Sequence, residues 1–386
     1  MKKVKIFVAA LAAAVVAISF AACGEKCASG HSYGEWTVTV AATCTEDGTE
    51  TRKCSVCDKE ETRPIAKLGH DYGDPVYAER DGKLVTVRKC SRCDVEDVKE
   101  VENGVAVRTW DELATAVKTN NAYIVLMNDI AKVGANDLGL RPYGADHSIT
   151  IDLNGKTIAS RISARTAWDG VKDCGKNLTV KILNGNVGTA DGYVADVKDG
   201  ANMIAYAIMI NGGRVNLTVE RVNMLGYYGG FYTNGSNAGS TVRMSDCKIK
   251  GANADSGASY LAGGHTVTFD HCAFDGNFGL YIKSGTVTLN DCAVRATGAY
   301  EQPNYNGNGA DGGGSGIVVD SVKGYNIESL TFVMNRGSIT STYGYAFEQV
   351  VTKGDNYSTS TLTGVSMSAG KDQNVFVTTE GAVTVR

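Results

Sequence analysis

The sequence predicts an all-β protein whose larger part is a right-handed parallel β-helix, with about eight to nine rungs of three short strands each. Three observations support this fold class: short apolar segments realign on one another, 46 glycines separate them, and only 4 prolines interrupt the 386 residues. A hydrophobic content of 43% excludes global disorder. The 38 basic and 42 acidic residues give a net charge of −4, so we expect no nucleic-acid partner.

Residues 1–22 are predicted to be a lipoprotein signal peptide and not part of the fold. Three early lysines precede a run of apolar and small residues that is short for a membrane span. The run ends in Phe20-Ala21-Ala22-Cys23, which resembles a bacterial lipobox. The resemblance implies a lipid on Cys23, followed by a linker over residues 23–30; an ordinary secretory signal is the alternative. We expect an exported chain, attached to the membrane by this lipid at the outer face of the bacterial cytoplasmic membrane, on the cell surface.

Residues 31–100 contain two imperfect copies of one short unit. The sequence Arg-Lys-Cys-Ser-x-Cys-Asp occurs at 52–58 and again at 88–94, and each copy opens with His-x-Tyr-Gly, at His31 and at His70. Together these motifs resemble the cysteine- and histidine-rich repeats of surface proteins from gut Gram-positive bacteria. The resemblance covers only this module of the chain.

A Cys-x-x-Cys pair directs two sulfur atoms toward one point, as tetrahedral zinc requires. The residues expected to form one Cys₃His site are Cys44, Cys54, Cys57 and His70. The second copy keeps Cys90 and Cys93 but lacks an equivalent of Cys44 and a later histidine, so one Cys₄ site made of both pairs is the alternative. We expect a structural zinc, because a unit this small needs a bound metal or a covalent cross-link to stay folded. Disulfide bonds, which suit an exported chain, are the competing interpretation, with free thiols as a third.

Residues 101–386 are predicted to form the β-helix. Each repeat reads apolar-x-apolar, two polar residues, apolar-x-apolar, which predicts two strands joined at a tight corner. The clearest copies are 217–224, 242–249, 267–274 and 287–294. A third strand precedes each copy, and a capping box from Thr109 to Glu112 predicts a helix that covers the first rung. The region resembles the pectate-lyase-like β-helix superfamily in fold. A β-sandwich of antiparallel hairpins is the alternative.

Equivalent residues of successive rungs are expected to lie about 4.8 Å apart, so the repeat alignment predicts neighbours. One corner column alternates in charge, and its members are Arg221, Asp246, His271 and Asp291. We interpret it as a solvated charge ladder, with a catalytic Asp-His-Asp group as the alternative. Cys247, Cys272 and Cys292 share an inward column and are expected to pack in the core.

The strand before each corner predicts a stripe of exposed aromatic and apolar side chains. Counting by alternate residues, the aromatic members are Phe231, Tyr260, Tyr281 and Phe347. Flat rings at regular spacing can stack on sugar faces, so these residues are the expected ligand-binding site. A register slip of one residue would bury the column instead, and Glu348, which this register places inside, argues for such a slip.

Three functions compete at this point. The favoured one is a non-catalytic surface protein whose β-helix binds a carbohydrate or a partner surface, as an adhesin does. The second is a polysaccharide lyase or glycoside hydrolase, for which Lys283, Asp320 and Asp291 are the candidate catalytic residues and Ca²⁺ would be needed only by a lyase. The third is a structural spacer. The fold class alone decides among none of them.

Overall fold

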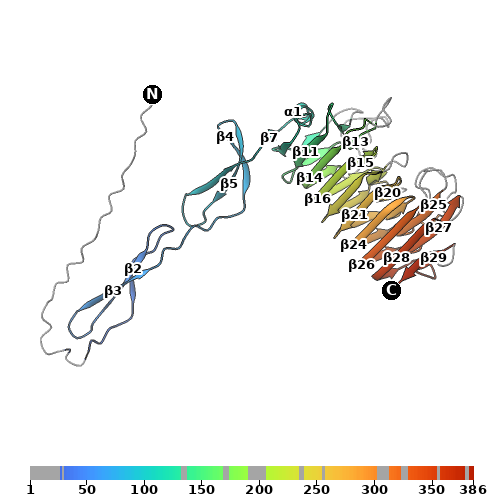
Figure 1. Cartoon of the computed structure of the whole chain (residues 1–386). Helices are drawn as coiled ribbons and strands as arrows, with labels where there is room; N and C mark the ends of the chain where they lie inside the picture. The colour runs from blue at the N-terminus through green and yellow to red at the C-terminus, as the bar shows by residue number, and fades with distance from the viewer. Residues whose placement is uncertain are drawn as a thin grey trace. The chain divides into compact units, whose positions relative to one another are not determined.

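The structure is a computed structural model that describes residue 27 and residues 30–131, 137–167, 174–189, 206–233, 239–253, 257–301, 313–322, 329–353, 357–378 and 382–386. The predicted signal peptide and Cys23, the residue expected to bear a lipid, lie outside these residues. The chain divides into two compact units, an N-terminal unit of residues 1–76 and 87–98 and a C-terminal unit of residues 77–86 and 99–386 (Figure 1). Within the described residues, no helix is both long and apolar enough to cross a membrane.

Two three-stranded sheets follow one another at the start of the described chain. The first contains β1 (Thr37–Val40), β2 (Gly48–Lys53) and β3 (Glu60–Ile65), and the second contains β4 (Val76–Arg80), β5 (Lys83–Lys89) and β6 (Glu96–Glu100). Of the described apolar residues of the N-terminal unit, those that are buried are Cys44, Cys54, Val87 and Cys90. A core of three thiols and one valine is too small to hold this unit together by apolar burial alone.

Surface stacking adds a second source of order to the first sheet. The guanidinium groups of Arg52 and Arg63 lie over the Trp36 ring, at 4.5 Å and 4.2 Å from its centroid. Both arginines also pair with carboxylates, Arg52 with Glu61 and Arg63 with Glu50. Such exposed pairs contribute little individually.

The C-terminal unit is a parallel β-helix, as predicted (Figure 1). One sheet contains nine strands, one from each turn, which agrees with the expected eight to nine rungs. In spatial order these strands are β10 (Leu138–Leu140), β13 (Ile162–Arg165), β15 (Tyr206–Asn211), β17 (Gly229–Thr233), β20 (Ser259–Leu261), β23 (Leu280–Ile282), β25 (Ile317–Val322), β27 (Phe347–Lys353) and β29 (Val375–Val377). All eight pairings between neighbouring strands of this sheet are parallel, which excludes the hairpin sandwich for this unit.

The second sheet of the C-terminal unit contains fifteen strands, because most turns contribute two strands or one long strand to it. Its main path is β7 (Gly104–Val107), β8 (Ala122–Leu126), β11 (His147–Asp152), β14 (Leu178–Gly188), β16 (Val215–Gly226), β18 (Thr241–Ser245), β21 (Thr266–Asp270), β24 (Gly285–Ala296), β26 (Leu330–Ser341), β28 (Ser358–Ser368) and β30 (Val383–Val385). Beside this path lie β9 (Ile130–Ala131), β12 (Thr157–Ala159), β19 (Lys248–Gly251) and β22 (Ala273–Gly276).

A single residue turns the chain at each predicted corner. Six corner residues adopt left-handed backbone conformations, with φ between 50° and 59°, and they are Asn184, Arg221, Asp246, His271, Asp291 and Arg336. The predicted charge ladder is present there. Both nitrogens of the His271 ring lie 4.0 Å from a carboxylate oxygen, one on Asp246 and one on Asp291. Asp291 also accepts a hydrogen bond from the Arg336 Nε at 2.7 Å, which lowers the pKa of the Asp291 carboxyl.

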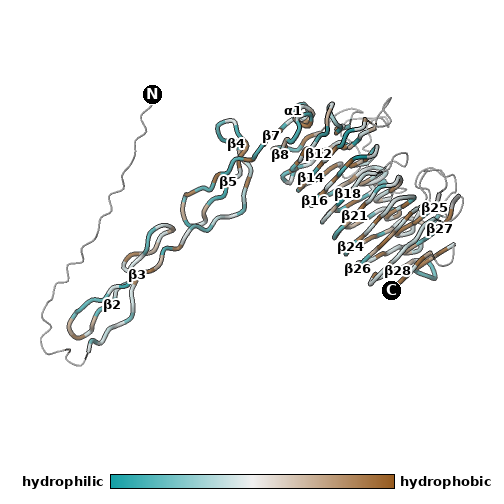
Figure 2. Tube along the Cα trace, in the orientation of Figure 1, coloured by the Kyte–Doolittle hydropathy of each residue, from teal (hydrophilic) through white to brown (hydrophobic). Residues whose placement is uncertain are grey.

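Alternate residues of every turn fill the β-helix interior, and the alternation is visible along the strands in Figure 2. Cys247, Cys272 and Cys292 are buried in this core, which confirms their predicted inward column. The predicted capping helix is α1 (Trp110–Ala116). Its capping box is complete, because the Thr109 side chain accepts from the Glu112 backbone and the Glu112 side chain accepts from the Thr109 backbone. Leu113 of α1 is fully buried in the same core.

The left-handed corners generate a test of the corner geometry. We expect His271→Val to lower the free energy of unfolding by about 1–2 kcal/mol, because a β-branched side chain opposes positive φ. His271→Gly is expected to match or exceed the wild type. Urea unfolding followed by circular dichroism measures both. Thr268→Val, in the adjoining strand β21, is the matched control and should change stability by less than about 0.5 kcal/mol. Equal losses for the two valine variants would contradict the interpretation.

Candidate functional site

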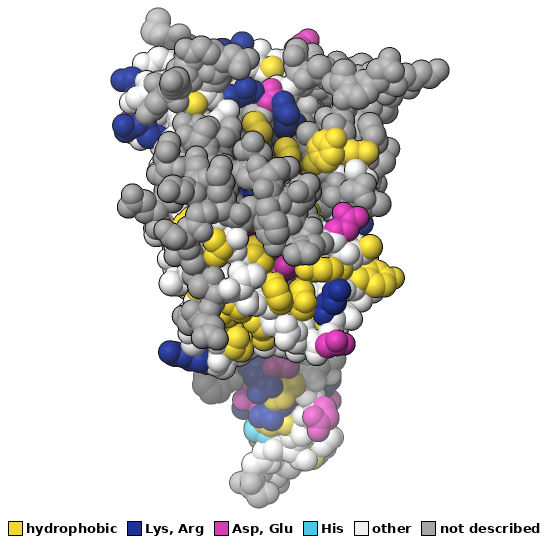
Figure 3. Space-filling view, turned by 90° about the vertical axis from the view of Figure 1, so that its right-hand side faces the viewer, with side chains coloured by type: hydrophobic (Ala, Val, Ile, Leu, Met, Phe, Trp, Pro, Cys, Tyr) yellow, Lys and Arg dark blue, Asp and Glu magenta, His cyan; other side chains and the backbone are white. Residues whose placement is uncertain are grey.

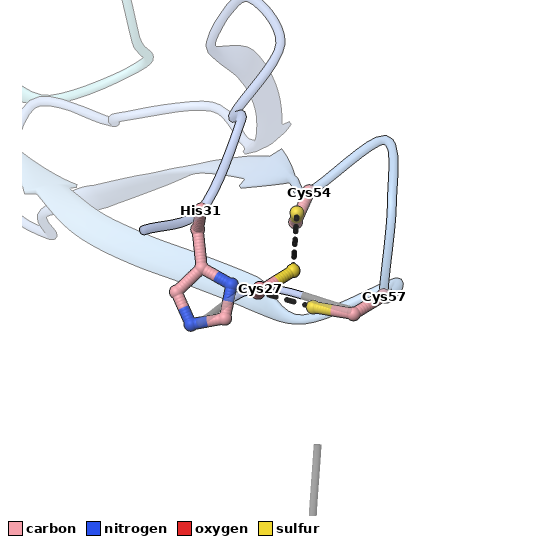
Figure 4. A group of neighbouring side chains, drawn as sticks. All are labelled: Cys27, His31, Cys54 and Cys57. Carbon is pink, nitrogen blue, oxygen red and sulfur yellow. Dashed lines mark hydrogen bonds between the residues drawn. The ribbon is translucent and has the colours of Figure 1, made fainter. Parts of the chain in front are cut away.

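The N-terminal unit contains two clusters of three cysteines and one histidine. In the first cluster the ligand atoms of Cys27, His31, Cys54 and Cys57 all lie within 4.8 Å of one another (Figure 4). The Sγ atoms of Cys27 and Cys54 are 3.9 Å apart, and the Cys57 Sγ lies 3.3 Å from the His31 Nδ1. Three sulfurs and one imidazole nitrogen around one point form a ligand set that can hold a metal such as zinc.

The second cluster repeats this arrangement in the second copy of the sequence unit. Its ligand atoms belong to Cys44, His70, Cys90 and Cys93 and also lie within 4.8 Å of one another. The Cys44 and Cys90 Sγ atoms are 3.7 Å apart, and the Cys93 Sγ lies 3.4 Å from the His70 Nδ1. Each Cys-x-x-Cys pair therefore belongs to one complete Cys₃His set, and the second set takes Cys44 from the first copy.

Local backbone contacts position each Cys-x-x-Cys pair beside its histidine. In both copies the tyrosine two residues after the histidine forms an antiparallel bridge to the first cysteine of the pair, Tyr33 to Cys54 and Tyr72 to Cys90. The His-x-Tyr-Gly motif thus places the imidazole next to the pair that follows it. After the first pair, Asp58 takes a left-handed conformation, and its N–H donates to the Cys54 carbonyl at 3.1 Å.

The predicted grouping of the metal ligands is wrong. The expected Cys₃His set is divided, because Cys54 and Cys57 belong to the first cluster whereas Cys44 and His70 belong to the second. The alternative Cys₄ site is also wrong, since the two Cys-x-x-Cys pairs serve different clusters. The prediction combined the first Cys-x-x-Cys pair with the histidine that follows it. In each copy, however, the histidine of the same cluster precedes the pair. It also placed Cys27 in a linker, although Cys27 is a ligand-set member, so the module begins before residue 31.

The charge state of the thiols differs within each cluster. The hydrogen bond to the Val56 backbone is the largest influence on Cys54, and together with further bonds from Cys57 and His31 it lowers the pKa of Cys54 to about 6. Burial acts most strongly on Cys90 and opposes ionisation, yet the N–H groups of Arg92 and Asp71, each 3.4 Å from the sulfur, bring its pKa down to about 6. By contrast, the hydrogen bond with Cys57 helps to raise the pKa of Cys27 to about 12. One thiolate is thus favoured in each cluster before any metal arrives.

Disulfide bonding fits these clusters less well than metal binding. Each cluster contains an odd number of cysteines, so a disulfide within a cluster would leave one thiol unpaired and would give the histidine no role. All four side chains of a cluster can serve one tetrahedral ion. The ten described cysteines are all unbridged.

The predicted aromatic stripe is wrong in register at two positions and wrong in exposure at all four. Phe231 and Phe347 point into the core and are fully buried, in an inward column that pairs Phe231 with Ser259 and Ile317 with Phe347. Tyr260 and Tyr281 do lie on the outer face, but they are 6% and 1% exposed. The cause is the varying connection between the sheets: Tyr232 precedes Val242 by 10 residues, whereas its pairing partner Tyr260 precedes the equivalent Val267 by 7. The parity of the column therefore changes from turn to turn.

The outer face of the nine-stranded sheet has a different aromatic column. It pairs Tyr232 with Tyr260, Tyr260 with Tyr281, Tyr281 with Val318, and Val318 with Glu348. The Tyr232 ring stacks on Tyr206 at a centroid distance of 4.2 Å and on Tyr260 at 5.1 Å. We call Tyr206, Tyr228, Tyr232, Tyr260 and Tyr281 the tyrosine ladder, because Tyr228 also lies 6.3 Å from Tyr206. Its first three members are half-buried or exposed, and Tyr228 is 46% exposed.

Hydrophobic side chains gather on the side of the C-terminal unit where Figure 1 labels β15, β20, β25 and β27 (Figure 3). This surface was missed by the sequence reasoning because Tyr206, Tyr228 and Tyr232 were not aligned as one set. The sequence did contain a signal for this set. Tyr232 directly follows Phe231, and it aligns with Tyr260 when the connection from Tyr232 to Val242 is allowed to be longer than the connection from Tyr260 to Val267.

The candidate catalytic residues are only partly together. Lys283 and Asp320 are neighbours on the outer face, with the Lys283 Nζ 3.5 Å from the Asp320 Oδ2. Tyr281 donates to the same oxygen at 2.8 Å. Asp291 lies apart from them at a corner, where it pairs with Arg336. The expected three-residue set is therefore wrong as a single site, although its Lys283–Asp320 pair is a real contact.

Glu348 is a second buried acid on this face. It accepts hydrogen bonds from the Ser315 hydroxyl at 2.8 Å and from the Tyr300 hydroxyl at 3.4 Å. Burial, with the nearby charge of Asp320 acting in the same direction, raises the pKa of Glu348. The register slip explains its location, because Glu348 occupies the outward column and not the core.

A scan against protein-family models and a search of curated proteins both find no match to this chain. The fold and the two clusters therefore define the protein by class alone: a parallel β-helix preceded by a module with two Cys₃His ligand sets.

The raised pKa of Glu348 predicts a pH-dependent stability. The folded chain holds the Glu348 proton more tightly than the unfolded chain, so this residue costs stability as the pH rises from the unfolded pKa through the raised folded pKa. Glu348→Gln removes that cost, and its melting temperature should exceed that of the wild type at neutral pH and approach it in acid. Thermal melts between pH 4 and pH 8 measure this, with the exposed Glu301→Gln as control. A constant difference at every pH would contradict the assignment.

Proposed function

We propose that this chain is an exported, lipid-anchored surface protein whose β-helix binds a carbohydrate through the exposed end of the tyrosine ladder. The observation that supports the proposal is the stack of Tyr206 on Tyr232, 18° from coplanar, beside the exposed Tyr228. Tyr232 is stacked between Tyr206 and Tyr260, so the ring that offers an apolar face to a sugar is the exposed Tyr228 beside this stack, and sugar rings present matching C–H faces. The export signal and the lipid on Cys23 rest on the sequence motif described above.

The buried half of the ladder supports its exposed half. Tyr260 stacks on Tyr232 with an interplanar angle of 15°, and Tyr281 lies 6.2 Å from Tyr260. These two rings, packed with Phe278, Val318 and neighbouring side chains, form an apolar cluster on the outer face. The exposed rings are thereby held at fixed spacing, which lowers the entropy lost when a ligand binds.

We further propose that both Cys₃His clusters bind structural zinc. The N-terminal unit has few buried apolar side chains among its described residues, and four of them are Cys44, Cys54, Cys90 and Val87. Zinc binding would supply the folding free energy that this small core lacks. All four positions of each set are protein ligands, which fits a structural ion and leaves no position for a substrate.

The lyase or hydrolase alternative has weaker support. Its base, Lys283, is 3% exposed and its acid, Asp320, is fully buried, so both are engaged with one another and not with an accessible groove. A calcium ion held jointly by Asp320 and Asp291 is not supported, because these residues lie in different columns. The spacer alternative is an outcome of the experiment that follows.

The carbohydrate proposal predicts specific losses on a glycan array. The double variant Tyr228→Ala and Tyr232→Ala should weaken binding by roughly tenfold or more, because it removes the exposed ring and the ring against which Tyr206 is stacked. Tyr343→Ala is the matched control, since Tyr343 is 56% exposed and lies outside the ladder. Binding that survives in the double variant would contradict the ladder as the site. Absence of any binding by the wild-type chain would favour the spacer.

The zinc proposal predicts the metal content of each variant. Elemental analysis should find two zinc ions per wild-type chain, one after Cys54→Ser with Cys57→Ser, and one after Cys90→Ser with Cys93→Ser. Cys174→Ser, outside both clusters, should retain two.

Cys44 provides the sharpest comparison. Adding Cys44→Ser to the 54/57 variant should weaken the remaining site, whereas adding it to the 90/93 variant should leave one ion bound, because Cys44 belongs to the second cluster. The reverse pattern would support the grouping expected from the sequence and contradict the observed one.

A further inference from the structure

A lysine and an aspartate are buried together on the outer face of the nine-stranded sheet. The Lys283 side chain is 3% exposed and the Asp320 side chain is fully buried, and the Nζ to Oδ2 distance is 3.5 Å. Their contact follows from the rung register, because Ile282 pairs with Val319 and the next residues along the two chains are Lys283 and Asp320. The pair thus links two consecutive rungs, β23 and β25.

The surroundings of this pair are largely apolar and aromatic. The cluster on this face consists of Tyr260, Ala262, Phe278, Tyr281, Val318 and Val350, with Tyr232 and Phe376 packed against it. The Lys283 Nζ also lies 5.1 Å from the centre of the Tyr281 ring. Burial of this kind keeps bulk water away from the Lys283 Nζ and the Asp320 carboxyl group and holds the two groups in contact.

Other titratable groups lie close to the pair. Tyr281 donates to the Asp320 Oδ2, and burial raises the pKa of this phenol, so it stays protonated as a donor. Glu348 lies one rung further on and interacts electrostatically with Asp320.

We propose that Lys283 and Asp320 condense to form an intramolecular isopeptide bond between these two rungs. The neutral amine of Lys283 attacks the Asp320 Cγ, and a new C–N bond forms. The C–Oδ2 bond then breaks, with Tyr281 donating to the departing oxygen and regaining a proton from the amine nitrogen. One water molecule leaves, and one N–H remains on the amide. The reaction needs no oxidant, reductant or activating co-reactant.

The bond would close a covalent loop that contains the inserted segment between β24 and β25. It would add a covalent link to the hydrogen bonds of the sheet. Such a link resists mechanical force that would separate hydrogen-bonded strands, and the chain is expected to act outside the cell. The proposal depends on neither carbohydrate binding nor zinc, so its test is independent of theirs. Exposed pairs do not share the required burial: Lys83 and Glu100 approach to 2.7 Å, but their side chains are 61% and 56% exposed.

Peptide mapping of the full chain tests the proposal directly. Trypsin cleaves after Lys250, Lys283, Arg295 and Lys323 in this region. An isopeptide bond protects Lys283, so the linear peptide 251–283 should be lost. A branched peptide joining 251–295 to 296–323 should appear, lighter than the sum of its parts by one water molecule. Tandem mass spectrometry should place the branch at Lys283 and Asp320.

Two variants and an internal control complete the experiment. Lys283→Arg keeps a buried cation but removes the amine nucleophile, so peptide 296–323 should be recovered in linear form. Tyr281→Phe should leave a larger unlinked fraction early after synthesis, because the donor to the departing oxygen is absent. Peptides containing Lys83 should be unmodified in every sample. Quantitative recovery of linear 251–283 from the wild-type chain would overturn the proposal, whatever the variants do.

Discussion

Parallel pairing between consecutive turns is the constraint on which the C-terminal unit depends. Each residue of a turn is placed against one residue of the turn before and one of the turn after, at about 4.8 Å. The corner ladder, the cysteine column and the tyrosine ladder are three results of this one rule. Opposite charges meet at the corners, thiols stack inside, and aromatic rings stack outside. The same rule brings Lys283 against Asp320, although 36 residues separate them along the chain.

The N-terminal unit follows a different principle, because it has so little apolar surface to bury. Its first sheet has short strands, the four residues of β1 are all exposed, and thiols occupy most of the buried positions among its described residues. Under the zinc proposal, metal coordination takes the place of packing there. Two Cys₃His sets, each assembled by a His-x-Tyr-Gly segment bridged to the Cys-x-x-Cys pair that follows, give this unit its fixed points.

The sequence could predict those features in which segment length is constant. The corner residues and the core cysteines lie at equal offsets within each repeat, so Arg221, Asp246, His271 and Asp291 were aligned correctly and all adopt the same left-handed conformation. The outer strand is reached through connections of unequal length, and a single extra residue exchanges the two faces. Phe231 and Phe347 were misplaced for this reason. The grouping of the metal ligands was predicted wrongly for another reason. Spacing identifies a Cys-x-x-Cys pair, but it does not show whether the histidine of the same cluster lies before or after that pair.

The position of Cys44 has a consequence for how such modules grow. Cys44 lies between β1 and β2 of the first copy, yet it completes the cluster of the second. In the second copy only Asp81 and Gly82, both at positive φ, separate β4 from β5, and no cysteine is present. A copy with a long connection between its first two strands thus supplies a cysteine to the cluster of the next copy. A copy with the short connection supplies none, so the series of clusters ends there. Duplication of the long form would lengthen the array by whole units with every coordination set complete.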